Sequence, residues 1–242
     1  MTASGAELLQ VVRLIEEAGV EICFANPGTT EMQIVGALSN SRVRVVLGLH
    51  ENVVTGAADG YARMSQAPSM TLLHLGPGLA NGIANLHNAK RGGSPVLNVV
   101  GTMATWHTAA EAPLKMDVHA IASTVSRWIG TPRTDEDFHE VVNTALHELK
   151  CPCLPGESRI VSLMIPHDLQ RSLQNHTDGR LTVTKPCQDS APTFGEVFDK
   201  IEGDMRTCDK GAYILGKTAL IEPVLSMFAA LAATTGAALL CV

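Results

Sequence analysis

Short apolar runs recur along most of the chain, and segments with apolar residues at helical spacing separate them. The runs predict strands at residues 21–25, 43–47, 69–75, 95–100, 126–130 and 159–165. The intervening segments predict helices at 4–19, 30–39, 51–65, 79–89 and 135–149. The apolar runs are continuous, which is typical of strands buried on both faces. Strands that alternate with helices in this way indicate right-handed βαβ units, and therefore an α/β fold with a doubly wound parallel sheet.

A polar stretch with one glycine and two prolines interrupts this pattern at residues 175–192, and we interpret it as a linker. The domain before it is expected to span residues 1–174. In residues 193–242 the pattern restarts, with helices expected at 193–201 and 221–233 and strands at 212–216 and 237–242. This segment is short for an α/β domain and ends on a buried type of strand, so it is expected to be an incomplete second domain.

Composition excludes several classes of function. Hydrophobic residues make up 45% of the 242 residues and the formal net charge is −6, so the chain can build a core but offers no basic surface for nucleic acid. The last twenty residues carry no charge, but Thr234-Thr235-Gly236 divides them, which favours a helix, a turn and a strand over a membrane span. No secretory signal is visible at the N-terminus.

Six cysteines are spread along the chain, at positions 23, 151, 153, 187, 208 and 241. Cys151-Pro152-Cys153 is the one close pair, and no second pair completes a zinc pattern. We interpret the cysteines as buried or loop thiols in a reducing compartment, which predicts a cytoplasmic protein.

Three loops follow expected strands: Asn26 to Thr29, Gly48 to Glu51, and His74 to Gly78. In a doubly wound sheet, the carboxyl ends of the strands meet at a crevice where ligands bind. Taken singly, the glycine loops are ordinary strand-to-helix turns, and Glu51 is an acid that complements a helix N-terminus. Neither glycine loop matches the dinucleotide fingerprint or the phosphate-binding P-loop.

Taken together, the loops form a wider pattern. It consists of Asn26-Pro27-Gly28, then His50-Glu51 followed by Gly56-Ala57-Ala58-Asp59-Gly60-Tyr61-Ala62-Arg63, then Gly76-Pro77-Gly78 with Asn81. This pattern resembles the N-terminal pyrimidine-binding domain of thiamine-diphosphate-dependent enzymes, and most of all acetolactate synthase large subunits and benzoylformate decarboxylase. The resemblance covers about residues 7–169, and the segment from about residue 210 is similar to the start of the family's central domain.

The resemblance implies thiamine diphosphate as cofactor and a 2-oxo acid as substrate. In the family, the cofactor loses a proton from C2 of its thiazolium ring and becomes an ylid that stabilises carbanions. By resemblance, Glu51 would hydrogen-bond N1′ of the aminopyrimidine and favour the imino tautomer that accepts this proton. The implied cofactor-binding residues are Pro27, Gly28, Glu51, Gly76, Pro77, Gly78 and Asn81.

Two further residues are implied in substrate binding. His74 stands at the position of an active-site histidine of the benzoylformate decarboxylase branch, so it is a second catalytic candidate that could relay protons; a structural histidine is the alternative. Thr29 stands where decarboxylase relatives place a hydroxyl near the substrate carboxylate. We interpret His50 and His87 as structural, and the other six histidines show no metal-ligand spacing.

The family's Mg²⁺ site is expected to be missing from this chain. Family members hold the diphosphate through Mg²⁺, using a Gly-Asp-Gly motif and a downstream asparagine in a third domain. Here Gly203-Asp204 is followed by Met205, and no asparagine follows Asn175. The chain is therefore expected to supply only the pyrimidine half of the pocket. Its expected partner is a second copy, or another chain, that carries the diphosphate-binding domain; a flavin requirement (FAD) stays open.

Two functions remain in view. The first is the pyrimidine half of a thiamine-diphosphate enzyme on 2-oxo acids, with acetolactate synthase-like carboligation or decarboxylation as the reaction and with this chain inactive alone. The second is a catalytically incomplete paralogue or fragment that binds or regulates a full-length subunit.

Overall fold

The computed structural model describes residues 6–153, 157–172, 211–216 and 224–241, together with the single residues 199, 203, 220 and 222. The chain divides into two compact units, Met1–Cys187 and Gln188–Val242. The predicted linker, residues 175–192, and the helix predicted at 193–201, except for residue 199, lie outside the described residues.

A six-stranded parallel sheet forms the centre of the first unit, with the order β2-β1-β3-β4-β6-β5. Its strands are β1 (Ile22–Asn26), β2 (Arg44–Leu47), β3 (Ser69–His74), β4 (Val96–Thr102), β5 (Trp128–Gly130) and β6 (Ile160–Pro166). This confirms the predicted doubly wound α/β fold. The order reverses at β1, because β2 lies on one side of it and β3 on the other. The carboxyl ends of β1 and β3 therefore border the crevice where such folds bind ligands.

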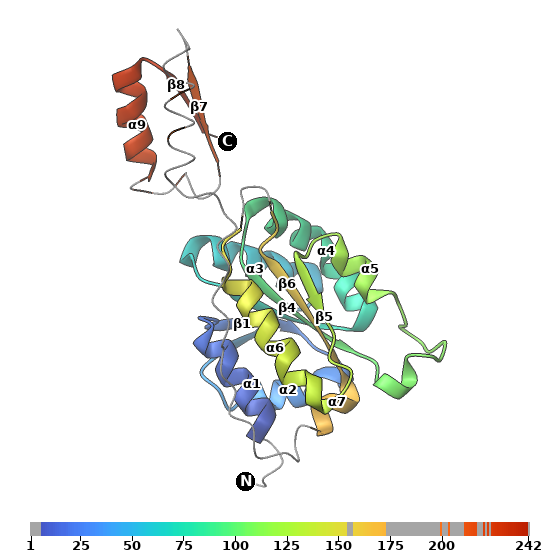
Figure 1. The fold of residues 1–242 in the computed structure, drawn as a ribbon. Helices are drawn as coiled ribbons and strands as arrows, with labels where there is room; N and C mark the ends of the chain where they lie inside the picture. Colours follow the sequence, from blue (N-terminus) through green and yellow to red (C-terminus); the bar gives the residue numbers. More distant parts are fainter. Residues whose placement is uncertain are drawn as a thin grey trace. The chain divides into compact units, whose positions relative to one another are not determined.

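Helices cover both faces of this sheet (Figure 1). One face carries α1 (Ala6–Glu17), α2 (Met32–Leu38), α6 (Asp135–Lys150) and α7 (His167–Ser172), and the other carries α3 (Glu51–Ser65), α4 (Leu75–Gly92) and α5 (Val118–Ser123). Two short 3-10 helices, η2 (Thr29–Glu31) and η3 (Thr105–His107), follow β1 and β4. On β4, Leu97 and Val99 join the first core while Val96 and Val100 join the second. Burial on both faces explains why the strands are continuously apolar.

A buried row of polar side chains crosses the sheet. The Thr71 hydroxyl donates to Asn98 Oδ1 at 2.9 Å, and Asn98 Nδ2 donates to Ser162 Oγ at 2.8 Å. The hydroxyls of Ser162 and Ser126 are hydrogen-bonded at 2.7 Å. Because each of these side chains has a partner, the row avoids the penalty of unsatisfied buried polar groups and helps to hold β3, β4 and β6 in register.

Helix α4 begins earlier than the hydrophobic pattern predicted. It starts at Leu75, so Gly76-Pro77-Gly78 forms its first turn and is not a separate loop. Leu75 adopts a left-handed backbone conformation, with φ of 51°, and completes the turn from strand to helix within one residue. Pro77 is tolerated there because the N–H groups of a first helical turn have no partner within the helix.

The second unit contains a parallel strand pair and a helix among its described residues. Strands β7 (Ala212–Leu215) and β8 (Ala238–Cys241) pair in register, and α9 (Val224–Thr235) precedes β8. Gly236, with φ of 68°, makes the turn between α9 and β8, which confirms the predicted helix, turn and strand. None of the helices in the described part of the chain is both long and apolar enough to cross a membrane.

Candidate cofactor site at the strand ends

The three loops singled out in the sequence meet at the carboxyl edge of the sheet. Asn26 Nδ2 donates to the carbonyl oxygen of Gly48 at 2.8 Å, which ties the end of β1 to the end of β2. Gly28 lies so close to His74 that an added Cβ would collide with the imidazole. The loop after β1 therefore touches the end of β3 on one side and the segment before α3 on the other.

Glu51 is the first residue of α3 and is half-buried at this edge. The His50 side chain caps the helix by accepting the backbone N–H of Asn52 at 3.1 Å, so His50 has a structural role here. Asn81 Nδ2 donates to Glu51 Oε2 at 3.1 Å, while Oε1 has no hydrogen-bond partner among the described residues. A Cβ at Gly78 would lie 3.4 Å from Oε1, so that glycine keeps the space beside the carboxylate small but open. One oxygen is thus held, and the other can accept a ligand's hydrogen.

Small residues let α3 and α4 pack closely enough to hold Glu51 and Asn81 together. A Cβ at Gly82 would lie 2.8 Å from Thr55 Cγ2, and one at Gly56 would lie 2.8 Å from Asn85 Nδ2. The Thr55 hydroxyl donates to the Gly82 carbonyl at 2.9 Å across the same contact. Any larger side chain at either glycine would push the helices apart.

A charged pair within α3 joins this helix to α4 at the end of α3 that lies far from Glu51. Arg63 Nε donates to Asp59 Oδ1 at 2.8 Å, and Arg63 Nη2 donates to the Asn88 carbonyl of α4 at 3.2 Å. Asp59 also accepts the hydroxyl of Ser94, which follows α4. Asp59 and Arg63 thus fasten α3 to α4 at this end of the helix.

A second polar group lies at the topological reversal, between β1 and β3. His74 Nδ1 is 2.8 Å from Glu31 Oε2 and 3.1 Å from the Thr30 hydroxyl, which itself donates to Glu31 Oε1. The backbone N–H of Gly28 donates to Glu31 Oε2 at 2.6 Å. Glu31 is fully buried, whereas the His74 side chain is 23% exposed. The buried carboxylate therefore holds one ring nitrogen, and the rest of the ring reaches the crevice.

Sequence reasoning missed Glu31 and Thr30. The hydrophobic pattern placed Thr30 at the start of a predicted helix, but α2 begins at Met32, and the Thr30 hydroxyl is hydrogen-bonded to Glu31 and His74. Thr29, the predicted substrate contact, is exposed at the same edge and its hydroxyl has no hydrogen bond among the described residues. The one sequence feature that could have pointed to Glu31 is its position three residues after Gly28. An acid at this position is equally typical of an ordinary first helical turn, so the feature does not identify a site.

The remaining predicted residues line the same edge. Pro27 is half-buried between Asn26 and Gly28. Gly76 is buried under Met116, since an added Cβ would lie 2.7 Å from Met116 Cγ. Pro77 is half-buried in the first turn of α4. His87 lies exposed on α4 and takes no part in this group.

The described cysteines differ in environment. Cys23 is buried and free, and burial raises the pKa of its thiol. Cys153 is half-buried and free, and burial is the largest cause of the raised pKa of its thiol. Cys241 is exposed and free. Cys151 is disulfide-bonded, which corrects the expectation that all six are thiols.

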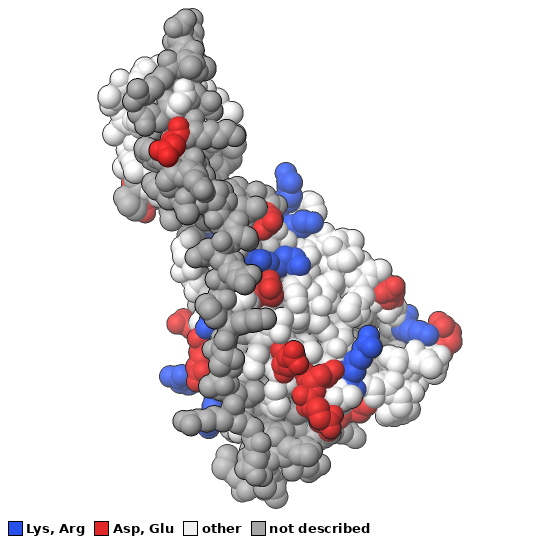
Figure 2. All heavy atoms as spheres, viewed as in Figure 1, with Lys and Arg blue, Asp and Glu red and all other residues white. Residues whose placement is uncertain are grey.

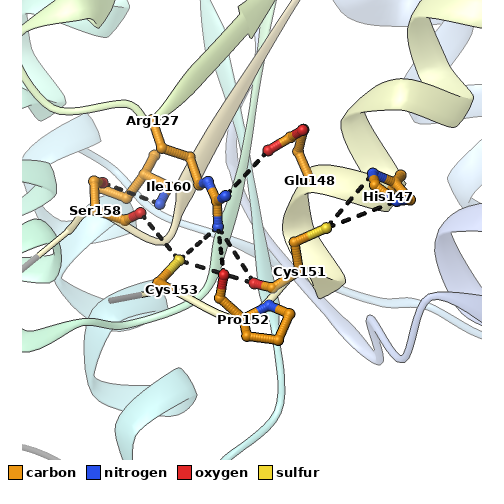
Figure 3. Close-up of polar contacts among 8 residues, drawn as sticks. All are labelled: Arg127, His147, Glu148, Cys151, Pro152, Cys153, Ser158 and Ile160. Carbon is orange, nitrogen blue, oxygen red and sulfur yellow. Dashed lines mark hydrogen bonds and ion pairs between the residues drawn. The ribbon is translucent and has the colours of Figure 1, made fainter. Parts of the chain in front are cut away.

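Arg127 holds the Cys151-Pro152-Cys153 segment (Figure 3). Its Nη1 donates to the Cys151 carbonyl at 3.3 Å and to Cys153 Sγ at 2.6 Å, and its Nη2 pairs with Glu148 Oε2 at 3.3 Å. These contacts tie the end of α6 to the start of β5. We therefore interpret the cysteine pair as part of a structural junction.

Charged side chains are mixed on the face shown in Figure 2. Lysines and arginines lie among aspartates and glutamates there, with uncharged surface between them. The described residues of this face form no broad basic surface of the kind that binds a phosphate backbone.

The described residues fit one end of thiamine diphosphate. At the aminopyrimidine end, the unpaired Oε1 of Glu51 offers a hydrogen-bond acceptor, and the buried Gly78 beside it adds no side chain that would cover this oxygen. At the diphosphate end a Mg²⁺ ion needs oxygen ligands. Within the described part of the chain, no three His, Cys, Asp or Glu side chains are grouped closely enough to hold a metal ion. The fit observed among the described residues is to the pyrimidine end.

Known proteins are similar to this chain. Residues 6–121 match the family model for the thiamine pyrophosphate enzyme, N-terminal TPP binding domain. The chain is 38% identical over 239 residues to a Mycobacterium tuberculosis protein named as an acetolactate synthase large subunit, IlvX, covering 98% of this chain and 44% of that protein. It is 29% identical over 156 residues to benzoylformate decarboxylase of Pseudomonas aeruginosa, covering 64% of this chain and 29% of that enzyme.

A solved structure agrees with the fold. The thiamine diphosphate-dependent 4-hydroxybenzoylformate decarboxylase of Rhodococcus jostii RHA1 matches with a TM-score of 0.76 at 22% identity, over 98% of this chain and 44% of that one. The chain thus spans less than half the length of these relatives. The matched residues 6–121 include Glu51, Asn81 and the Glu31–His74 pair. Residues 6–121 of this chain therefore form an N-terminal TPP-binding domain of the thiamine pyrophosphate enzyme family.

Proposed function

We propose that the first unit supplies the aminopyrimidine half of a thiamine diphosphate site in an enzyme that acts on 2-oxo acids. The observation that carries the proposal is Glu51, whose Oε2 is held by Asn81 while Oε1 stays unpaired beside Gly78. When bound, thiamine diphosphate supplies an acidic thiazolium carbon that can attack the carbonyl carbon of a 2-oxo acid.

In this proposal, Glu51 Oε1 shares a proton with N1′ of the aminopyrimidine. The hydrogen bond from Asn81 fixes the carboxylate plane, so Oε1 is presented in one orientation. Such positioning is what a proton-transfer group needs, because its partner atom must come within hydrogen-bond reach. The close packing of α3 on α4 keeps Glu51 and Asn81 at this separation.

His74 serves the substrate side of the same crevice. A carboxylate can only accept hydrogen bonds, so His74 Nδ1 donates its hydrogen to Glu31 and Nε2 keeps a lone pair. His74 Nε2 can then take up or release a proton at the substrate, with Glu31 as a positioning residue behind it. Thr29, exposed at the same edge, is the proposed contact for the substrate carboxylate.

An apolar rim beside Glu51 supports a partner that completes the site. Leu47, Leu49 and Val53 are 67%, 92% and 62% exposed. Exposed apolar groups gathered at a functional site are typical of interaction surfaces. We propose that a second copy, or another chain, covers this rim and brings the diphosphate-binding domain.

The proposed reaction class rests on the names of two relatives. One is named as an acetolactate synthase large subunit and another as benzoylformate decarboxylase. We propose carboligation or decarboxylation of a 2-oxo acid. A group at His74 Nε2 that takes up a proton and then releases it suits decarboxylation followed by protonation, because the product then needs a proton from the protein.

The second candidate function is a non-catalytic partner of a full-length subunit. The apolar rim of Leu47, Leu49 and Val53 favours association in either case. The two functions differ in what Glu51 does: a binding module needs the rim and does not need the carboxylate.

The test is exchange of the C2 proton of bound cofactor for deuterium, in an assembly of this chain with a partner that carries the diphosphate-binding domain. Glu51→Gln should slow the exchange by about 10²- to 10⁴-fold, the range typical of a positioned acid–base group. Glu111→Gln makes the same chemical change at an exposed carboxylate, 91% exposed, and should leave the exchange unchanged. Equal exchange in the Glu51 variant and the wild type would refute the catalytic role and leave the binding-module function.

A further inference from the structure

A pocket lies at the opposite edge of the sheet from Glu51. It encloses about 540 Å³, and its lining includes Glu16 of α1, Glu21 and Ile22 at the start of β1, and Arg42 and Arg44 at the start of β2. Strands rise about 3.3 Å per residue, so Ile22 and Asn26, the two ends of β1, lie about 13 Å apart. The pocket therefore shares no residue with the cofactor edge.

One charged pair, Glu16 and Arg42, lines this pocket. Glu16 Oε1 accepts the backbone N–H of Arg42 at 2.7 Å, and Glu16 Oε2 pairs with Arg42 Nε at 3.1 Å. The backbone N–H of Arg42 is the largest cause that lowers the pKa of Glu16, which keeps the carboxylate ionised. Both oxygens of Glu16 are thus occupied, so its carboxylate is not free for a ligand; the Arg42 side chain is 89% exposed, and only its Nε is held by this pair.

Two further charges in the lining are nearly unpaired. The Arg44 guanidinium has no hydrogen bond or ion pair with any described residue. The Glu21 carboxylate has one contact among the described side chains, a long hydrogen bond of 3.4 Å from the Tyr61 hydroxyl. The pocket thus presents one available cation and one available anion, and with the Glu16–Arg42 pair its formal charge is zero.

The uncharged part of the lining is the ring of Tyr61 with Val20 and Ile22. Phe24 meets the Tyr61 ring edge to face, with ring centroids 6.2 Å apart, and so holds its orientation. An ordered aromatic ring beside two aliphatic side chains favours contact with an apolar group of similar size.

We propose that this pocket binds a small zwitterion of the α-amino-acid class with an apolar side chain. The carboxylate lies on the guanidinium of Arg44, which suits it because the arginine fork donates two parallel hydrogen bonds. The ammonium lies on Glu21, and the side chain packs on the ring of Tyr61. A polyanion is disfavoured by the two carboxylates in the lining. This site goes beyond the proposed function, since it uses no residue of the cofactor edge.

The first test compares three ligands with the same ring and different charges, by calorimetric titration of the full chain. L-Phenylalanine carries both charges, 3-phenylpropanoate lacks the ammonium, and 2-phenylethylamine lacks the carboxylate. Each missing charge-assisted contact should weaken binding by about tenfold or more. The proposal fails if either single-charge analogue binds as tightly as phenylalanine, or if phenylalanine produces no binding heat at millimolar concentration.

The second test locates the site with matched variants. Arg44→Gln should lower the affinity for phenylalanine about tenfold and leave the affinity for 2-phenylethylamine, which has no carboxylate, unchanged. Glu21→Gln should likewise lower the affinity for phenylalanine about tenfold and leave the affinity for 3-phenylpropanoate, which has no ammonium, unchanged. Arg91→Gln removes the same charge from the exposed end of α4 and should change neither affinity. Equal behaviour of the Arg44 and Arg91 variants would overturn the assignment. The ligand comparison on the wild-type chain stands even where a variant fails to fold.

Discussion

The contact between Glu31 and His74 decides which ring nitrogen of His74 carries the hydrogen. Glu31 is fully buried and is surrounded by donors, namely the Gly28 backbone N–H at 2.6 Å, the Thr30 hydroxyl, and His74 Nδ1 at 2.8 Å. Because a carboxylate only accepts, the geometry requires the Nδ1–H tautomer of neutral His74. Replacing Glu31 by glutamine is the perturbation that tests this requirement.

The size of the effect follows from the bond that is lost. A hydrogen bond to a charged group contributes about 1.5–3 kcal/mol, and about 1.4 kcal/mol corresponds to tenfold in population. The carboxylate should therefore favour Nδ1–H about 10- to 150-fold, so that about 90% or more of neutral His74 is this tautomer. Glu31→Gln removes the charge and places an NH₂ group where one oxygen was. The preference should fall to a few-fold, or reverse where that NH₂ faces Nδ1.

Two-bond ¹⁵N–¹H correlation spectra of the histidine-labelled chain report the tautomer directly, with His74 assigned through His74→Gln. His87, which is exposed on α4, is the internal control, and its pattern should be the same in wild type and Glu31→Gln. A wild-type His74 that is mainly Nε2–H would refute the reasoning. So would a His74 pattern unchanged by Glu31→Gln.

Three other predictions concern stability. Gly82→Ala should lower the free energy of unfolding in urea by about 1–3 kcal/mol, because the new Cβ would lie 2.8 Å from Thr55 Cγ2. Gly60→Ala is the control: its new Cβ would have no atom within 4 Å, so it should raise the free energy of unfolding by about 0.5–1 kcal/mol. Equal effects of the two substitutions would contradict the packing argument. Asn98→Ala should lower the free energy of unfolding by about 1–3 kcal/mol, because it leaves the buried Thr71 hydroxyl without its partner while the Ser162 hydroxyl keeps its bond to Ser126. A loss below about 0.5 kcal/mol would mean that the Thr71 hydroxyl finds another partner. The pKa of Glu16 is lowered in the folded state, so the ionised carboxylate stabilises the fold above the ordinary pKa of 4.5, and this contribution is lost as the pH falls. The Tm difference between wild type and Glu16→Gln should therefore shrink on acidification. A Tm difference that does not change with pH would count against this reasoning.

Local sequence pattern was sufficient to predict the strands, most helices and the fold class of the first unit. The six strands of the sheet and most of its helices were predicted from runs of apolar residues and from helical spacing. This works because burial imposes a period on neighbouring residues, and a strand buried on both faces shows it as a continuous apolar run. Glu51 was found through its position at a strand end together with the motif around it.

Only the tertiary structure placed the polar partners. Glu31 and His74 are 43 residues apart in sequence, and Glu51 and Asn81 are 30 apart. Their contact depends on the order β2-β1-β3, which sets β1 beside β3, and on the close packing of α3 against α4. Leu75 has a left-handed backbone conformation and starts α4 directly after β3, which the hydrophobic pattern did not predict. The pocket at the amino edge likewise needs the starts of β1 and β2 side by side. Hydrophobic spacing carries information about neighbours along the chain, whereas the strand order that creates these contacts is decided by packing between distant segments.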